Sequence, residues 1–232
     1  MGKGITVMSI IDFIKSNNEY FEDYITRSTY HSNGIEGSTL SYAETYAVLF
    51  NDNSFQVTAQ PREIYEAINH KYALNYILGL EDGYLTEKII KDIAILINKN
   101  INDIDGYRKT QVYIKGAEHI PPAPNMLNQE MMYFVHNYNS TVYDNVFDKI
   151  ATNHINFERI HAFEDGNGRT GRLLINFELL HNNLPPVIIP KEERTKYFEF
   201  IASTDASGLS EYFKHLSENE KRACCIYFEN GG

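Results

Sequence analysis

The sequence predicts an all-α protein, and the main reason is that apolar side chains recur at helical spacing. Residues 61–80 place them on one broad face, and Pro61 suits the first turn of a helix. Residues 86–101 show the same spacing after Thr86, which is a suitable N-cap. A single domain is expected over residues 1–232, because a chain of this length builds one sizeable core. Further helices are predicted over residues 128–139, 142–160, 169–181, 191–201 and 210–228.

One segment departs from the helical pattern. Residues 106–124 alternate around Val112 and Ile114, reach Gly116, and end in a proline-rich stretch. This pattern predicts a small β-hairpin between helices. An isolated hairpin is only marginally stable, so it is either a connecting ribbon packed on the helices or an exposed edge that pairs with an extended partner segment. On these residues alone the connecting ribbon is favoured.

Composition and charge narrow the class of protein. Hydrophobic residues make up 43% and charged residues 22%, which is ordinary for a globular domain in water. The net charge of −10 argues against a nucleic-acid-binding surface, so any anion site must be local. The two cysteines, Cys224 and Cys225, are adjacent and predict a reducing compartment. With no signal-peptide pattern and no apolar run of membrane-spanning length, the expected location is the cytoplasm, away from membranes.

The strongest functional signal is the stretch HAFEDGNGRTGR at residues 161–172. It predicts the end of one helix, a tight loop and the start of a new helix. Gly166 and Gly168 permit backbone torsions closed to other residues, and amides ahead of a helix N-terminus form a nest for an anion. Arg169 and Arg172 lie three residues apart on one helical face, with forked donors suited to phosphate oxygens. The loop is therefore a predicted phosphate site.

Two further side chains of this stretch suit chemistry at a phosphate. Asp165 is a candidate ligand for Mg²⁺, which commonly joins a carboxylate to the phosphates of a substrate. His161 is a candidate base, because a neutral imidazole accepts a proton from a hydroxyl. Each element alone is weak, but together they indicate phosphoryl or nucleotidyl transfer. The stretch is not a P-loop, because no Gly-Lys-Ser/Thr follows the glycines.

These residues resemble the signature of Fic-domain proteins, His-x-Phe-x-(Asp/Glu)-Gly-Asn-Gly-Arg-x-x-Arg, at every specified position. Ala162 stands where the family usually has Pro. The resemblance follows the family's order of elements from about residue 28 to residue 205, with residues 106–124 in the place of the Fic flap. It implies a Fic fold, a compact helical bundle with a small hairpin beside the active site. It also implies transfer of AMP from ATP to a Ser, Thr or Tyr hydroxyl of a protein, with pyrophosphate leaving.

The resemblance implies a role for each residue of the site. His161 would be the base that deprotonates the target hydroxyl, and Asp165 would carry Mg²⁺, with Mn²⁺ as an alternative. The phosphates would be held by amides and side chains of Gly166, Asn167, Gly168, Arg169 and Arg172. Weaker matches place adenosine against Tyr197, Phe198 and Asp205, and the target protein against the flap residues Val112, Ile114 and His119.

A second short motif lies upstream, in the stretch TYHSNGIEGSTLS. Ser32 and Glu36 are four residues apart and share a face if the stretch is helical, although the Asn-Gly pair between them is unusual inside a helix. From these residues alone, a helix and a loop with a capping Ser are about equally supported. Residues 28–40 resemble the Fic inhibitory motif (Ser/Thr)-x-x-x-Glu-(Gly/Asn), which Ser32, Glu36 and Gly37 match.

This second resemblance implies a class II Fic protein, in which Glu36 pairs with Arg172 and blocks the place of the ATP γ-phosphate. Three alternatives stay open. The same site would suit a hydrolase that removes AMP from a modified protein, a nucleotide-binding regulator without catalysis, or transfer of another group such as UMP or phosphocholine. The expected partners are ATP and a protein with an accessible hydroxyl. Self-association and automodification fit the family, and the 17 tyrosines supply acceptors.

Overall fold

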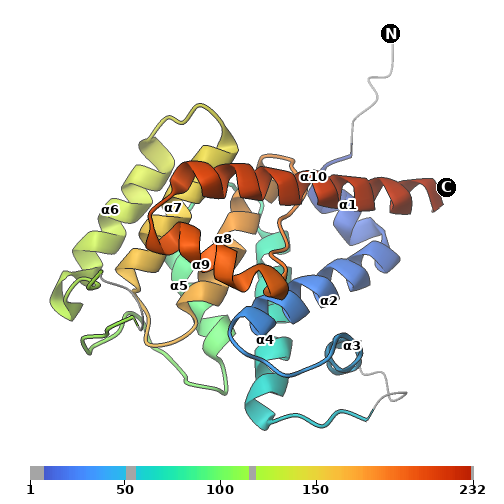
Figure 1. Ribbon diagram of the computed structural model, residues 1–232, viewed down its shortest axis with the longest axis horizontal. Helices are drawn as coiled ribbons and strands as arrows, with labels where there is room; N and C mark the ends of the chain where they lie inside the picture. Colours follow the sequence, from blue (N-terminus) through green and yellow to red (C-terminus); the bar gives the residue numbers. More distant parts are fainter. Residues whose placement is uncertain (1–7, 51–55, 115–118, 231–232) are drawn as a thin grey trace.

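The computed structural model describes residues 8–50, 56–114 and 119–230, with only the backbone of residues 228–230. It consists of α-helices joined by loops, and no β-strand occurs in these ranges (Figure 1). The predicted all-α class is therefore confirmed. The α-helices are α1 (Ile10–Ser16), α2 (Asn18–Ile35), α3 (Tyr42–Phe50), α4 (Pro61–Gly79), α5 (Glu87–Asn98), α6 (Leu127–Ser140), α7 (Val146–Ile160), α8 (Asn167–His181), α9 (Arg194–Ala202) and α10 (Ala206–Asn230), with short 3-10 turns at η1 (Pro124–Met126) and η2 (Lys191–Glu193).

Helix α8 lies in the middle of the molecule (Figure 1). It packs against α2, α4, α5 and α7. Its residues from Arg169 to Leu180 are all buried, the charged ones included, so the helix has no face toward water. Neighbours on every side fix the position of its N-terminus, which begins at Asn167 inside the predicted phosphate loop.

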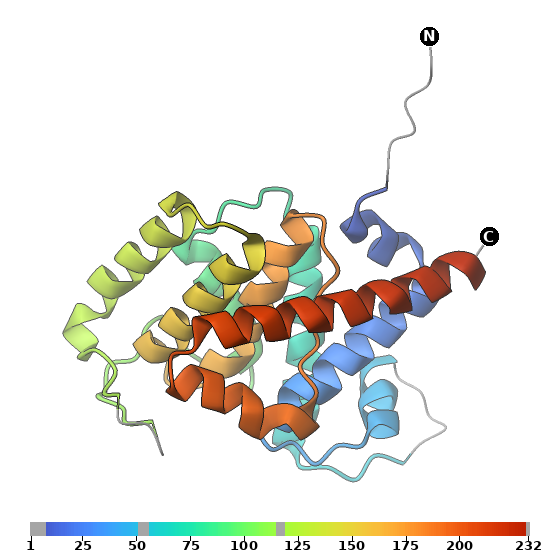
Figure 2. The ribbon, with the colours of Figure 1, turned by 45° about the horizontal axis from the view of Figure 1, so that its top comes forward.

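Two apolar clusters make up the core. The larger cluster gathers side chains of α1 to α8, together with Phe163 of the loop and Cys224 of α10. The smaller cluster joins Ile35 at the end of α2 to Tyr197 of α9 and Phe213 of α10. The long helix α10 contacts α7, α9 and α2, and runs across the molecule from α9 toward α2 (Figure 2). No helix in the described part of the chain combines the length and the apolar character needed to cross a membrane.

Local sequence signals place several helix ends as predicted. Thr86 caps α5 with its hydroxyl, and Pro61 is the first residue of α4. Helix α7 starts later than predicted, at Val146 rather than at residue 142. The physical reason is the side chain of Asn145, which accepts a hydrogen bond from a first-turn amide and so caps the helix there.

The segment predicted as a β-hairpin forms no strand in the described residues of 106–124, and its turn at 115–118 lies outside the described residues. Side chains join the two arms instead. Arg108 donates to the Pro122 carbonyl at 2.5 Å, and Gln111 donates to the Pro121 carbonyl at 3.0 Å. Proline has no backbone N–H, so the return arm cannot complete a ladder of hydrogen bonds. The predicted strands are therefore replaced by two extended arms tied by side chains.

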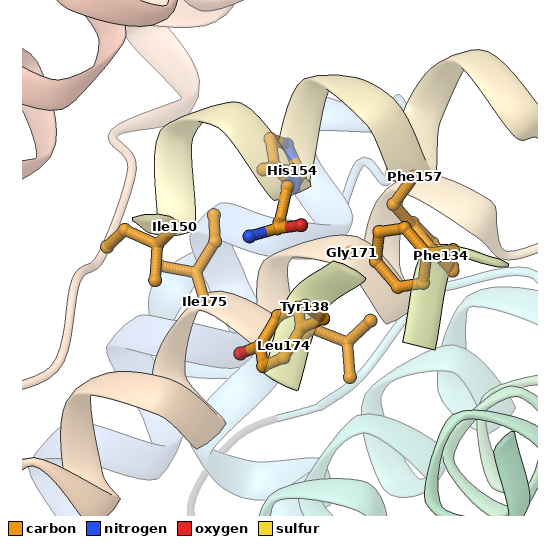
Figure 3. Close-up of a pocket in the computed structure, with 9 residues that line it drawn as sticks. Phe134, Tyr138, Ile150, His154, Phe157, Gly171, Leu174 and Ile175 are labelled. Atoms are coloured by element: carbon orange, nitrogen blue, oxygen red, sulfur yellow. The ribbon is translucent and has the colours of Figure 1, made fainter. Parts of the chain in front are cut away.

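A small internal space lies between α6, α7 and α8 (Figure 3). Phe134 and Tyr138 of α6, Phe157 of α7 and Leu174 of α8 are among the residues that line it. Its volume is about 10 Å³, which is close to the space of a single water-sized sphere. A space of this size belongs to the packing of the core, since ligand pockets are far larger.

Candidate active site

The stretch at residues 161–172 folds as predicted, into a helix end, a tight loop and a helix start. His161 ends α7 in the left-handed conformation, with φ 49° and ψ 55°, and Gly166 precedes α8 at φ 76°. Phe163 is wholly buried and anchors the loop, with its ring centroid 5.5 Å from that of Tyr107. The loop is thereby held at a fixed place beside the N-terminus of α8.

Asn167 ties this loop together with its side chain. Its Oδ1 accepts from the Phe163 amide at 2.9 Å, and its Nδ2 donates to the Phe163 carbonyl at 2.8 Å. Asn167 is 2% exposed, so this structure does not support the predicted phosphate contact through the side chain. Its main-chain amide lies in the first turn of α8, where amides have no partner within the helix.

Gly166 occupies a position that no other residue fits without strain. Its φ of 76° lies in the left-handed region, and a Cβ built there would lie 2.8 Å from Asn98 Nδ2 and 2.8 Å from Ile97 Cγ2. We expect Gly166→Ala to lower the free energy of unfolding by about 1–2 kcal/mol from the backbone conformation alone. Thermal denaturation followed by circular dichroism measures this as a lower Tm. Gly79→Ala is the matched control, because a Cβ there meets nothing within 4 Å; equal falls in Tm would contradict the prediction.

A cleft of about 750 Å³ opens at the loop. Its walls are the C-terminal end of α2 with the residues that follow, the first turns of α4 and the N-terminus of α8. The first-turn amides of α8 and the positive end of its dipole lie at this wall, which favours an anion. The volume suits a small-molecule ligand of nucleotide size. The lining residues are Glu36, Gly37, Ser38, Thr39, Gln60, Arg62, Glu63, Glu66, His161, Glu164, Asp165, Gly166, Asn167, Gly168 and Arg169.

The acidic end of α2 meets an arginine of α8 at the edge of this cleft. Arg172 Nη2 lies 2.6 Å from Glu36 Oε1. The Ser32 hydroxyl accepts from Arg172 Nε at 3.0 Å, and the Ser32 carbonyl accepts from Nη2 at 3.0 Å. Arg172 is 6% exposed; burial by itself would lower its pKa, but the charge of Glu36 raises the pKa overall. Ser32 and Glu36 therefore hold the guanidinium that the family resemblance gives to the γ-phosphate.

The stretch that leads to Glu36 is helical. Of the two structures that its sequence allowed, a helix and a loop with a capping Ser, the helix is the one observed. Helix α2 runs to Ile35, and Glu36 follows as its C-cap in helical conformation. Gly34 gives room to a neighbouring side chain, because a Cβ there would lie 2.5 Å from Lys191 Cδ. Gly37 then turns the chain away at φ 102°, a conformation that favours glycine. The close approach of the Lys191 side chain explains Gly34, and the turn of the chain away from the helix explains Gly37.

Asp165, the predicted metal ligand, is paired with two arginines. Its Oδ2 lies 2.6 Å from Arg62 Nη2, and its Oδ1 lies 3.2 Å from Arg169 Nη2. Oδ1 also accepts from the Gly166 amide at 2.6 Å. Burial by itself would raise the pKa of Asp165, but the charges of Arg169 and Arg62 lower it overall. The carboxylate is therefore ionised at neutral pH.

Arg169 is buried beneath this carboxylate and does not reach out beside Arg172. It is 2% exposed, and its Nη1 lies 3.2 Å from Glu66 Oε1. Glu66 also accepts from Arg62 Nε at 3.0 Å, so one carboxylate of α4 holds two arginines. Neither Arg62 nor Glu66 was predicted, because helical spacing shows only which face of α4 is apolar. Their separation of four residues is the one signal that pointed to a charged pair.

His161 lines the cleft. Its carbonyl accepts from Arg108 Nε at 2.8 Å, and the Arg108 amide donates to the Ala162 carbonyl at 2.9 Å, which ties the flap segment to the loop. The ring nitrogen Nδ1 has no hydrogen-bond partner among the residues described. Burial lowers the pKa of His161 below its ordinary value of 6.5, so the ring is neutral at pH 7. A neutral imidazole at a cleft is suited to accept a proton.

The residues predicted to contact adenosine do not line the cleft. Tyr197 is 0% exposed, and its hydroxyl lies 2.5 Å from His154 Nε2 in the core. Its ring has no surface for a ligand, so this structure contradicts the predicted contact; the packing of α9 on α10 turns the ring inward. The Phe198 ring centroid lies 4.8 Å from Arg194 Cζ, so this ring packs against a guanidinium. Asp205 Oδ1 accepts a hydrogen bond from the Gly208 amide, in the first turn of α10, at 2.9 Å.

The predicted flap residues also lie outside the set that lines the cleft. Val112 and Ile114 are half-buried. His119 is bound to the end of α7: its Nε2 donates to the Arg159 carbonyl at 2.9 Å, and its Nδ1 accepts from Arg159 Nη2 at 3.0 Å. These two bonds tie the His119 ring to Arg159 of α7, so docking of a target by His119 stays a prediction.

The donor set at Asp165 fits a cation that enters together with a nucleotide. Within the described ranges, no group of three or more His, Cys, Asp or Glu side chains is placed to bind a metal by itself. Mg²⁺ keeps several waters and is usually bound by one or two carboxylates plus the phosphates of a substrate. One ionised carboxylate beside a nest of amides meets that requirement.

Comparison with known proteins agrees with this arrangement. The profile of the Fic/DOC family matches residues 84–179, which include the whole 161–172 loop. Residues 84–179 are therefore similar to a Fic domain. The protein adenylyltransferase Fic of Drosophila mojavensis is 32% identical over 205 residues, which are 85% of this chain and 40% of that protein. The chain therefore spans less than half the length of such curated relatives.

Two solved structures share the Fic fold. A Fic-domain-containing signalling protein from Bacteroides thetaiotaomicron is similar with a TM-score of 0.75 at 22% identity, over 93% of each chain. Fic-1 from C. elegans is similar with a TM-score of 0.72 at 23% identity, over 94% of this chain and 71% of that chain. The predicted Fic fold is thereby confirmed.

Proposed function

We propose that this Fic-domain chain is a protein adenylyltransferase, which transfers AMP from ATP to a Ser, Thr or Tyr hydroxyl of a protein, itself included. The observation that carries the proposal is the cleft at the N-terminus of α8, where His161, Asp165 and the amides of the loop meet. The name of the Drosophila relatives, protein adenylyltransferase, supports it. In this proposal residues 1–232 act as one domain.

In the proposed reaction the cleft holds the triphosphate of ATP. Main-chain amides of residues 166–168 and the dipole of α8 bind phosphate oxygens. Arg172 binds the γ-phosphate after it leaves Glu36, and Arg169 binds the β-phosphate while it keeps its ion pairs with Asp165 and Glu66. His161 accepts the proton of the target hydroxyl while the hydroxyl oxygen attacks the α-phosphorus. The new O–P bond forms as the bond to pyrophosphate breaks, and the arginines hold the charge of the leaving pyrophosphate.

Asp165 is the residue proposed to hold Mg²⁺, with Mn²⁺ as an alternative. When bound, the ion neutralises charge on the phosphates and so supplies electrostatic stabilisation. The chain's own part is to orient the carboxylate. The Gly166 amide and Arg169 hold Oδ1 at 2.6 and 3.2 Å, which fixes the direction of Oδ2.

The Glu36–Arg172 pair is proposed to keep the enzyme inactive. A Cβ at Gly168 would lie 2.6 Å from Glu36 Oε1, so the carboxylate stands directly over the first turn of α8. Its negative charge therefore repels a triphosphate from that place. Because Arg172 is 6% exposed, water and salt screen this pair less than a pair on the surface.

Labelled ATP tests the proposed reaction. We expect the Glu36→Gly variant to retain label on protein when the α-phosphate is labelled and to retain none when the γ-phosphate is labelled, because only AMP is transferred. Label from the γ-position would show phosphorylation instead. Label from neither position, with an added acceptor protein, would contradict the proposal. Labelled UTP in the same assay tests the alternative donor.

The pKa of His161 predicts how the reaction depends on pH. The base works in its neutral form, and burial places its pKa below 6.5. We therefore expect kcat/KM of Glu36→Gly to stay level from about pH 8 to about pH 6.5 and to fall at lower pH, where protonation removes the base. Initial rates of AMP incorporation against pH measure this. An acidic limb centred above about pH 7 would contradict the assigned base.

A hydrolase that removes AMP from a modified protein is the second candidate. The observation that favours it is Glu36, a carboxylate whose side chain is 36% exposed at the cleft and so can position a water. A pre-AMPylated target separates the two functions. Release of AMP by the wild type but not by Glu36→Gly would support the hydrolase, and release by neither would contradict it. A regulator without catalysis predicts ATP binding and no covalent product in any of these assays.

The proposed partners are ATP and a protein with an accessible hydroxyl, and self-association and automodification are proposed with them. The cytoplasmic location rests on the two adjacent cysteines. Cys224 is buried, Cys225 is exposed, and both are free thiols, which is consistent with a reducing compartment.

A further inference from the structure

Arg62 covers the carboxylate of Asp165, the proposed metal ligand, in the free protein. It lies in the first turn of α4, and its Nη2 donates to Asp165 Oδ2 at 2.6 Å, although the two residues are 103 positions apart. Its Nε donates to Glu66 Oε1 at 3.0 Å. The Arg62 side chain is 55% exposed and the Asp165 side chain is 29% exposed, so the contact is open to water. In the free protein, the positive charge at Asp165 Oδ2 therefore comes from Arg62, a side chain of the same protein.

The contact with Arg62 occupies Asp165 Oδ2, the carboxylate oxygen that a metal ion would use. Asp165 Oδ1 is already bound by the Gly166 amide and by Arg169, at 2.6 and 3.2 Å. Oδ2 has only Arg62 as a hydrogen-bond partner among the residues that the structure describes. A Mg²⁺ ion approaches its oxygen ligands to about 2.0–2.1 Å, and its charge repels a guanidinium at the same oxygen. The two cations therefore exclude each other at Oδ2.

We propose that Arg62 competes with the divalent cation for Asp165 and so sets how strongly Mg²⁺ tightens ATP binding. The inference deepens the proposed function and rests on it. Of the two arginines on Asp165, Arg62 is the one that yields, since its exposed guanidinium moves from the carboxylate directly into water. Arg169 is 2% exposed and would be left as a buried charge without its partner.

Arg62 is the counterpart of Glu36 on the metal side of the cleft. In the free protein Arg172 faces Glu36, and Asp165 faces Arg62, so both groups meet an opposite charge of the chain. A nucleotide with its metal ion brings both signs at once. In the proposed complex the triphosphate would take the place of Glu36 at Arg172, and Asp165 would hold the ion in place of Arg62.

The test measures ATP binding by isothermal titration calorimetry, with and without saturating Mg²⁺, in the Glu36→Gly/His161→Ala background. This background frees the phosphate site and prevents turnover, so the readout is binding alone. We expect Arg62→Gln to raise the factor by which Mg²⁺ tightens ATP binding roughly two- to fivefold, the range for an exposed ion pair. Lys88→Gln is the matched control, because it removes an exposed charge paired with Asp92 on α5, and it should leave the factor unchanged.

Asp165→Asn separates direct competition from a general effect of charge. In that variant Arg62→Gln should leave the factor unchanged, and an equal rise there would overturn the proposal. A lower factor in Arg62→Gln would show that Arg62 holds the carboxylate in place for the metal, and an unchanged factor would show no competition; both results overturn it. A background protein that binds no ATP would overturn the proposed function itself, which is distinguishable because no factor is then measurable.

Discussion

The Glu36→Gly variant is expected to incorporate AMP at least about tenfold faster than the wild type. The pair between Glu36 and the buried Arg172 is charge-assisted, at 2.6 Å, and hydrogen bonds to charged groups contribute about 1.5–3 kcal/mol. Because about 1.4 kcal/mol corresponds to a tenfold change in an equilibrium, removing the pair frees Arg172 for the γ-phosphate by at least that factor. Initial rates with α-labelled ATP measure the effect.

Two variants serve as controls for this result. Glu164 is an exposed carboxylate that lines the same cleft, so Glu164→Gln should incorporate AMP at nearly the wild-type rate. Glu36→Gln keeps the size of the side chain but removes its charge, and we expect a rate between the wild type and Glu36→Gly. Absence of any rise in Glu36→Gly would refute the inhibitory role of Glu36.

The His161→Ala change is expected to remove AMP transfer from the activated variant. Loss of a general base typically lowers a rate by about 10²–10⁴-fold, so Glu36→Gly/His161→Ala should approach background. ATP affinity should stay close to that of Glu36→Gly, because the phosphates are bound by α8 and its arginines. The paired measurements are the rate with α-labelled ATP and the Kd for ATP from calorimetry.

His136→Ala is the matched control for this loss. His136 is exposed on α6 and lies outside the cleft, so its removal should leave the rate of the activated variant unchanged. Undiminished transfer in the His161 variant would contradict the assigned base. A Kd for ATP that rises with the loss of rate would assign His161 to binding instead of proton transfer.

Local patterns predicted the parts of this site that depend on neighbouring residues. The loop at 161–172 was predicted because its glycines, acid and arginines lie within twelve residues, and it folds as a helix end, a turn and a helix start. The helix that carries Glu36 was left undecided, because an Asn-Gly pair gives no local reason for helix. The reason for a glycine in this helix lies in a distant part of the sequence. Gly34 makes room for the side chain of Lys191, which is 191 − 34 = 157 positions later.

The features that were missed or wrongly predicted depend on contacts between distant parts of the chain. Arg62 meets Asp165 only because α4 packs on α8, and no pattern in either segment signals that meeting. The family resemblance placed adenosine against Tyr197, but the packing of α9 turns this side chain into the core. In the flap segment, a local alternation predicted strands that the prolines of the return arm do not allow.

Intact-mass spectrometry of Glu36→Gly after incubation with ATP and Mg²⁺ tests most directly whether this cleft transfers a nucleotide. The account predicts a gain of one or more whole AMP units on the protein, and no gain when His161 is also replaced by Ala. An unchanged mass in a folded protein that binds ATP would contradict it, and so would the same gain with and without His161.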